Sequence, residues 1–166
     1  MTILKPLYGS WQAFTITLAS LASDTNLLAG RAGTVFDNTT DLFEDLCISG
    51  KFTTGTTPTV DRQIEVWAYT DFGSNSVYPD SITGSDANKT LTSAAIKRSG
   101  LVQLAFIQTD GTSNRTYPMR QRSLVQALGG VIPLKVAPFV VHNTGVNLNA
   151  TAGNHEIMFK GINGQF

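Results

Sequence analysis

Two histidines and a single cysteine are the side chains of this sequence best suited to bind a metal or to move a proton. His142 and His155 stand at the two ends of "HNTGVNLNATAGNH", a segment rich in Asn, Gly and Thr. Structural zinc needs four Cys or His ligands, and catalytic zinc needs three. One cysteine and two histidines are too few, so we predict no metal site. We expect both imidazoles to hydrogen-bond turn backbone at the ends of strands.

Carboxylates at regular spacing are the next candidates for chemistry. Asp37, Asp41 and Asp45 recur at every fourth position of "DNTTDLFED". On a strand this spacing separates neighbouring carboxylates by about 13 Å, which is too far for one ion. Cys47 lies in an apolar run, where a buried and inert thiol is expected, and no nucleophile motif of the form G-x-S-x-G occurs. We therefore predict no catalytic, cofactor-binding or metal-binding residues, no cofactor and no enzymatic activity.

The composition is that of a one-domain chain with a largely uncharged polar surface. Its 166 residues are 42% hydrophobic and 14% charged, with a formal net charge of +0. Ser, Thr, Asn and Gln must supply the polar surface, which is typical of β-rich extracellular, lectin-like and virion proteins. Without a basic stripe we expect no nucleic-acid partner, and no apolar run is long enough to predict a membrane span. No secretory leader is recognisable, so we expect synthesis in the cytoplasm.

The elements that must position these side chains are short strands separated by turns rich in Gly, Asn and Pro. The clearest is "QIEVWAYT", in which apolar side chains alternate between two faces. Further strands are predicted over 10–20, 41–52, 100–109, 115–121, 131–143 and 155–162. Only "LTSAAIKRSG" and "SLVQALGG" favour helices, both short. About seven or eight strands without β-α alternation predict an all-β fold, a single two-sheet antiparallel sandwich over residues 1–166, jelly-roll-like in topology.

Two segments fit poorly inside such a sandwich and are our candidates for contacts with other proteins. Residues 1–9 form either an extended apolar arm or an edge strand of this same domain. The connector of residues 71–100 is too long for a hairpin, and loops of that length are usually functional. The predicted interaction residues are Ile3, Leu4, Leu7 and Tyr8 in the arm, and Phe72, Tyr78 and Ile82 in the connector.

Aromatic residues raise the alternative of a sugar-binding module. Trp67 and Tyr69 share one face of their predicted strand, and Trp11 and Tyr78 are further candidates. Lectin-like sandwiches stack sugars on exposed aromatic rings and bind hydroxyl groups through Asn and Asp. The competing interpretation places Trp67 and Tyr69 in the core or in a subunit interface.

Four stretches of the sequence together resemble a known family. They are "LLAGRAGTVFDNTTDLFEDLCISGKFTTGTTPT", "QIEVWAY", "RTYPM" and "GGVIPLKVAPFVVHNTGVNLNATAGNHEI". Over about residues 20–160 the chain resembles small virion proteins of tailed bacteriophages. The resemblance implies a jelly-roll β-sandwich that acts as a capsid cement or decoration protein, and it brings no catalytic residues with it.

The expected function is therefore structural. The resemblance implies binding to the outer surface of the major capsid lattice, so the expected location is the capsid surface of the virion. The expected partners are the major capsid protein and further copies of this chain, as a dimer or trimer. The alternative is a carbohydrate-binding module of a tail or host-attachment appendage.

Overall fold

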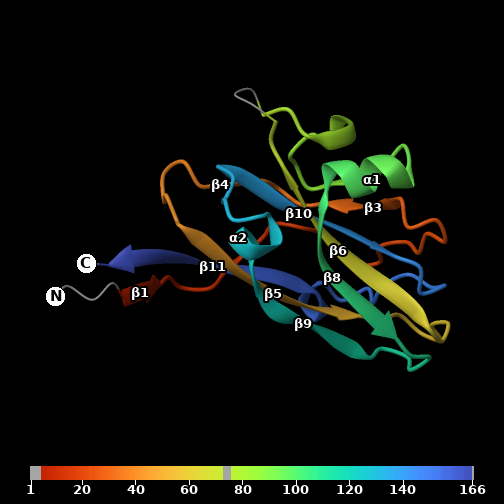
Figure 1. Ribbon diagram of the computed structural model, residues 1–166. Helices are drawn as coiled ribbons and strands as arrows, with labels where there is room; N and C mark the ends of the chain where they lie inside the picture. Colours follow the sequence, from red (N-terminus) through yellow and green to blue (C-terminus); the bar gives the residue numbers. More distant parts are fainter. Residues whose placement is uncertain (1–4, 73–75, 166) are drawn as a thin grey trace.

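Two antiparallel sheets pack face to face in the computed structural model, which describes residues 5–72 and 76–165 (Figure 1). The five-stranded sheet has the order β1-β11-β5-β9, with β2 also paired to β11; the six-stranded sheet has the order β7-β3-β10-β6-β8, with β4 also paired to β10. The strands are β1 (Lys5–Tyr8), β2 (Gln12–Ala13), β3 (Ala29–Ala32), β4 (Phe36–Asp37), β5 (Asp45–Thr53), β6 (Arg62–Thr70), β7 (Ala87–Thr90), β8 (Val102–Thr109), β9 (Thr116–Ser123), β10 (Lys135–His142) and β11 (Glu156–Gln165). The helices, all short, are η2 (Pro79–Ser81), α1 (Ala94–Gly100), α2 (Leu124–Ala127) and η3 (Ala152–Asn154). The predicted antiparallel sandwich is confirmed.

Alternate residues of the central strands fill the space between the sheets. In β6, Ile64, Val66 and Ala68 point into this space and are at most 1% exposed. Ile157 and Phe159 of β11 meet them from the other sheet. Successive side chains of a strand point to opposite faces, so the residues between these lie on the outer faces of the sandwich. The alternation predicted for "QIEVWAYT" is confirmed in β6, and β11 alternates in the same way.

Within the connector of residues 71–100, β7 joins the six-stranded sheet as an edge strand, whereas η2, α1 and the segments next to them cover the outer face of that sheet and form a third layer (Figure 1). Trp67 and Tyr69 of β6 are 7% and 0% exposed beneath it. Tyr78 and Ile82 of the connector are packed into the same cluster, 8% and 5% exposed. The hypothesis that Trp67 and Tyr69 stack on a sugar is therefore wrong, because both rings are enclosed by the protein itself.

A buried ion pair holds α1 onto the sheet. The Lys97 ammonium lies 2.8 Å from a carboxylate oxygen of Glu65, and both side chains are less than 10% exposed. The indole N–H of Trp67 also donates to Glu65 (2.9 Å), and Lys97 donates to the carbonyl of Leu27 (2.6 Å). A buried charge pair needs further hydrogen bonds to be tolerable, and here the Leu27 carbonyl and the Trp67 indole supply them. Ser93, within the stretch predicted to form this helix, caps it by accepting from the Ile96 N–H.

The predicted strand over residues 10–20 is only partly a strand. Its beginning pairs with β11 as β2, but the chain then leaves that sheet. The Phe14 N–H donates to Ile157 (2.9 Å), whereas the Thr15 carbonyl accepts from Thr34 beside the other sheet (2.8 Å). The segment therefore crosses between the sheets along one side of the sandwich and cannot belong to either ladder, although its apolar residues still enter the core.

β1 and the last residues of β11 form a two-stranded ribbon that projects beyond the sandwich (Figure 1). β5 pairs with β11 only as far as Ile162, so Asn163–Gln165 pair with β1 alone. Of the two interpretations of the first residues, the edge strand is correct for Lys5–Tyr8. All four residues of that strand are exposed, because no second layer lies over them.

Candidate functional site

The ribbon presents two of the predicted interaction residues to solvent. Leu7 is 53% exposed and Tyr8 is 57% exposed. They lie on opposite faces of the ribbon, since Tyr8 pairs with Ile162 and Leu7 pairs with Asn163. Ile3 and Leu4 lie outside the described residues.

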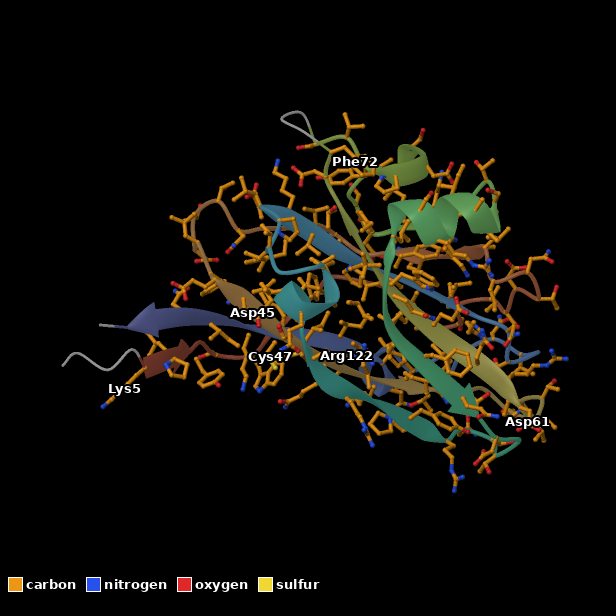
Figure 2. All side chains as sticks on the ribbon, in the orientation of Figure 1. Lys5, Asp45, Cys47, Asp61, Phe72 and Arg122 are labelled. Atoms are coloured by element: carbon orange, nitrogen blue, oxygen red, sulfur yellow. The ribbon has the colours of Figure 1, made fainter. Side chains whose placement is uncertain are left out.

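Three neighbouring loops carry further exposed apolar side chains, and Figure 2 shows Phe72 on one of them well away from Lys5 of the ribbon. We call these loop residues the apolar end: Leu42 (64% exposed), Phe72 (54%), Val77 (55%), Val131 (75%) and Leu134 (53%). The three loops touch one another. The Asn38 N–H donates to the Leu134 carbonyl (2.7 Å), and the Lys135 ammonium donates to the Ser76 hydroxyl (2.7 Å). Large exposed apolar side chains gathered at one site are characteristic of interaction surfaces.

The turn that presents Leu42 is fixed by a buried asparagine. Asn38 is 2% exposed. Its side-chain oxygen accepts from the Phe43 N–H (2.9 Å), and its amide donates to the Phe43 carbonyl (3.0 Å). Leu42 adopts a φ of 49°, a left-handed conformation that a leucine does not favour. An exposed leucine held in this conformation by a buried clamp is a fixed part of the surface, which reduces the entropy lost on binding.

Charges around the apolar end are mainly acidic. Asp41 and Glu44 lie on the turn beside Leu42, and Asp71 precedes Phe72. Lys135 lies 3.7 Å from the Asp37 carboxylate. Hydrogen bonds from Thr39, supplemented by Lys135, lower the pKa of Asp37 below its usual value, so this carboxylate stays charged at neutral pH.

At the base of the ribbon a lysine lies between two aromatic rings on the open face of the five-stranded sheet. The Lys160 ammonium is 4.8 Å from the ring centroid of Tyr8 and 4.9 Å from that of Trp11. Trp11 is 39% exposed. A shallow pocket of about 360 Å³ extends from it, lined by Trp11, Ser49, Gly50, Gln121, Glu156 and Met158. This pocket combines one aromatic wall with amide, hydroxyl and carboxylate groups.

A larger groove, of about 460 Å³, lies on the other side of the molecule between residues 17–22 and the strands β3 and β7. Its most basic side chain, Arg31, is already engaged by Asp86 and Asn88. Burial disfavours the charge of Asp86, but hydrogen bonds from Arg31 and Thr17 prevail and lower its pKa to about 2. The charges of Arg31 and Asp86 therefore neutralise each other and are not free to bind a ligand in the groove.

The two histidines are structural in the way the sequence predicted. His142 is fully buried; its Nε2 lies 3.0 Å from the Leu21 carbonyl and its Nδ1 lies 3.0 Å from the Thr144 hydroxyl. Burial lowers the pKa of His142 to about 4. The Nε2 of His155 lies 2.8 Å from the Asn149 carbonyl, and burial lowers its pKa as well. Both rings are neutral at pH 7 and hold loops against strand ends.

The remaining candidates for chemistry are dispersed. Cys47 is half-buried on the open face of the five-stranded sheet, and burial raises the pKa of its thiol, so the thiol is protonated at neutral pH. Among residues 5–72 and 76–165, no group of three or more His, Cys, Asp or Glu side chains is placed to hold a metal ion. Asp45 serves the backbone instead, accepting from the Val125 N–H at the start of α2 (2.9 Å).

Of the predicted interaction residues, the structure brings only some to the surface. Leu7, Tyr8 and Phe72 are exposed at the ribbon and the apolar end. For Tyr78 and Ile82 the prediction is corrected. Both side chains point from the connector into the cluster against the six-stranded sheet, so they cannot meet a partner in this conformation. The sequence analysis missed Leu42, Val77, Val131 and Leu134. The sequence held a signal for one of them. Val131 directly follows Gly129 and Gly130, so it cannot continue the preceding helix and must lie in a loop.

The chain matches no protein-family model and no curated protein. Within the described part of the chain, no helix has the length and apolar character needed to cross a bilayer.

Proposed function

We propose that this protein is a structural component of a tailed-bacteriophage virion, a cement or decoration protein that binds the outer surface of the major capsid lattice. The observation that carries the proposal is the combination of the projecting ribbon with the apolar end. Together they offer a partner exposed leucine, valine, phenylalanine and tyrosine side chains on a rigid sandwich. The sequence resemblance to phage virion sandwiches is the second support.

A cement protein needs contact area and rigidity. The apolar end sits on turns fixed by hydrogen bonds, and the ribbon widens the surface that a partner can cover. A stable protein interface buries about 1,200–2,000 Å² in total. Repetition over a lattice adds avidity, so each contact can be modest. Contacts between copies, as a dimer or trimer, are part of the same proposal.

Occupancy on purified particles tests the proposal. Antibody labelling in electron microscopy should find the protein in many copies on heads. A variant with Leu42→Ser, Val131→Ser and Leu134→Ser should bind capsids at least about tenfold more weakly, because each substitution removes apolar contact area. The matched control is Val60→Ser, a 59% exposed valine on a loop at the other end of the molecule, near the labelled Asp61 in Figure 2. Labelling confined to tails would refute the capsid proposal.

The pocket beside Trp11 favours a second candidate function, a carbohydrate-binding module of a tail or attachment appendage. Its aromatic wall could stack on the apolar face of a sugar ring, while Gln121, Ser49 and Glu156 could bind hydroxyl groups. A glycan array with the intact protein tests this function. Specific binding that is lost in Trp11→Ala and kept in Phe106→Ala, which changes another exposed ring, would support it. An array without signal would exclude it.

A further inference from the structure

We propose that the free edge of β8 receives an extended acidic segment of a partner protein, which adds a strand to the six-stranded sheet. The site is remote from the residues of the apolar end, and the inference does not depend on the capsid proposal. β8 and β9 are the outermost strands of their sheets and run along the same side of the sandwich (Figure 1). Between them lies a groove of about 210 Å³.

β8 differs from the other three sheet edges in having little protection. Edge strands are usually blunted by proline, by charge, by shortness or by a bulge, because an unpaired ladder attracts other strands. β1 and β7 are four residues long and contain Pro6 and Lys89, respectively. β9 has Pro118, two arginines and an irregular register with β5.

The sequence of β8, "VQLAFIQT", has eight residues and no charge or proline. Its one irregularity lies opposite Val66 and Trp67, which leaves the stretch from Ala105 to Thr109 in regular pairing with β6. Phe106 within that stretch is 58% exposed. An uncharged, regular and partly apolar edge is well suited to strand addition.

The phase of the ladder identifies the backbone groups that face outward. Gln63 bonds to β10, since its carbonyl accepts from the Asn143 N–H (3.1 Å). In an antiparallel ladder such bonds alternate, so Ile64 bonds to the other neighbour, its partner Ile107 in β8. The N–H and C=O groups of Phe106 and Gln108 therefore point away from β6, into the space that an added strand would occupy.

Two arginines select the chemistry of the added strand. Arg120 and Arg122 of β9 line the groove together with Phe106 and Ile107 of β8. Both arginines are exposed, and no carboxylate among the described residues pairs with either. A second copy of this chain paired edge to edge by two-fold symmetry would place its own arginines beside these two. That repulsion disfavours a second copy and favours a segment with Asp or Glu on alternate residues.

Peptide binding to the full-length protein tests the inference. The probe is a soluble synthetic peptide in which valine alternates with glutamate, and its glutamine and lysine analogues are the comparisons. Binding is followed by nuclear magnetic resonance, with the amides of Phe106 and Gln108 as reporters. We expect the affinity order glutamate, glutamine, lysine, with the glutamate peptide weakening as salt is added. Equal affinities, or no shift at β8 with any peptide at millimolar concentration, would overturn the inference.

Two pairs of variants separate charge from backbone. Arg120→Gln with Arg122→Gln should weaken the glutamate peptide about fivefold, whereas Arg98→Gln, at an exposed arginine of α1, should leave it unchanged. Gln108→Pro removes one outward N–H without breaking the β6 ladder and should weaken all three peptides; Gln108→Ala, which removes only the side chain, should not. Circular dichroism checks that each variant is folded.

Two other outcomes would point to different occupants. Light scattering of the wild-type protein reports its oligomeric state. A dimer that Gln108→Pro dissociates would mean that a second copy occupies the edge, against the inference. Binding of a single-stranded oligonucleotide that competes with the glutamate peptide at equal affinity would mean that the arginines bind phosphate, which also contradicts it.

Discussion

His142 shows how a residue able to do acid-base chemistry becomes a purely structural one. Its ring is fully buried between the carbonyl of Leu21 and the hydroxyl of Thr144. Burial disfavours the charged imidazolium and lowers the pKa to about 4 from the ordinary 6.5. In the unfolded chain the same ring is protonated below about pH 6.5. The folded state thus binds fewer protons than the unfolded state between these two pH values.

This difference predicts that the protein loses stability on mild acidification. The contribution of His142 is fully present above pH 6.5 and is lost as the pH falls towards 4. The free energy of unfolding should decrease by about 1.4 kcal/mol per pH unit in this window, or about 2 kcal/mol between pH 6.5 and 5. Urea denaturation at a series of pH values measures it.

His142→Gln is the control for that titration, because glutamine can occupy a hydrogen-bonded site without titrating. The variant should be less stable at pH 7 but should lose most of the slope between pH 6.5 and 5. A smaller slope of the same sign should remain, since burial also lowers the pKa of His155. An unchanged slope in the variant would assign the pH dependence to other groups.

Lys97 and Glu65 allow a second prediction at this scale. Lys97→Met leaves the Glu65 carboxylate buried without its partner, so it should cost about 3–5 kcal/mol of stability. Adding Glu65→Gln removes the stranded charge and should recover a large part of that loss. Thermal denaturation of the two single variants and the double variant measures the coupling. A double variant whose loss of stability equals the sum of the two single losses would show that the two groups act independently.

At the scale of elements, local pattern predicted strand faces well and contacts between distant segments poorly. The alternation in β6 was predicted correctly, because one side chain in two must face the core whatever it packs against. The helix caps Ser93 and Ser123 were also predictable, since capping is decided within four residues. The crossing of residues 14–22 from one sheet to the other depends on partners far away in sequence and left no local signal.

The candidate site was predicted only in part for the same reason. Leu7, Tyr8 and Phe72 were selected as apolar residues in segments without an obvious place in a sandwich, and they are exposed. Tyr78 and Ile82 met the same criterion but are buried, because the outer face of β6 carries Trp67 and Tyr69 and needed a cover. A strand with large apolar residues on both faces, as β6 has, indicates a third layer.

Close contact between β3 and β10 gives a prediction at this scale. At Gly30 a Cβ atom would overlap the backbone carbonyl oxygen of Val140, and strand backbones cannot yield as a side chain can. Gly30→Ala should therefore destabilise the protein by about 1–3 kcal/mol. The matched control is Gly153→Ala, where a Cβ atom would meet nothing within 4 Å. Chemical denaturation of both variants compares them, and equal stabilities would contradict the tight packing of β3 against β10.

At the scale of the whole molecule, the two cores share strands. β6 and β10 contribute to the cluster between the sheets with one face and to the cluster under the connector with the other. Neither cluster can lose its packing without exposing the second. The connector is thus part of the same cooperative unit as the sandwich, although it forms a layer outside the two sheets.

Calorimetry can test that cooperativity. We expect a single thermal transition whose calorimetric enthalpy equals the van't Hoff enthalpy. Hydrogen exchange should protect the amides of α1 that lie above Glu65 about as strongly as those of β6. Two resolved transitions, with α1 exchanging in the first, would instead make the connector an independently melting layer.

The pairing of Lys5 with Gln165 brings the two ends of the described chain side by side in the ribbon. A short glycine-rich linker between them would turn the ribbon into a hairpin, so the sequence is suited to circular permutation, with new ends opened in a surface loop such as residues 110–115. By the same geometry, a tag or cargo fused next to Lys5 or Gln165 would lie beside the exposed Leu7 and Tyr8 of the ribbon. Fusions built for purification or for display should therefore be placed in permuted variants when partner binding is to be measured.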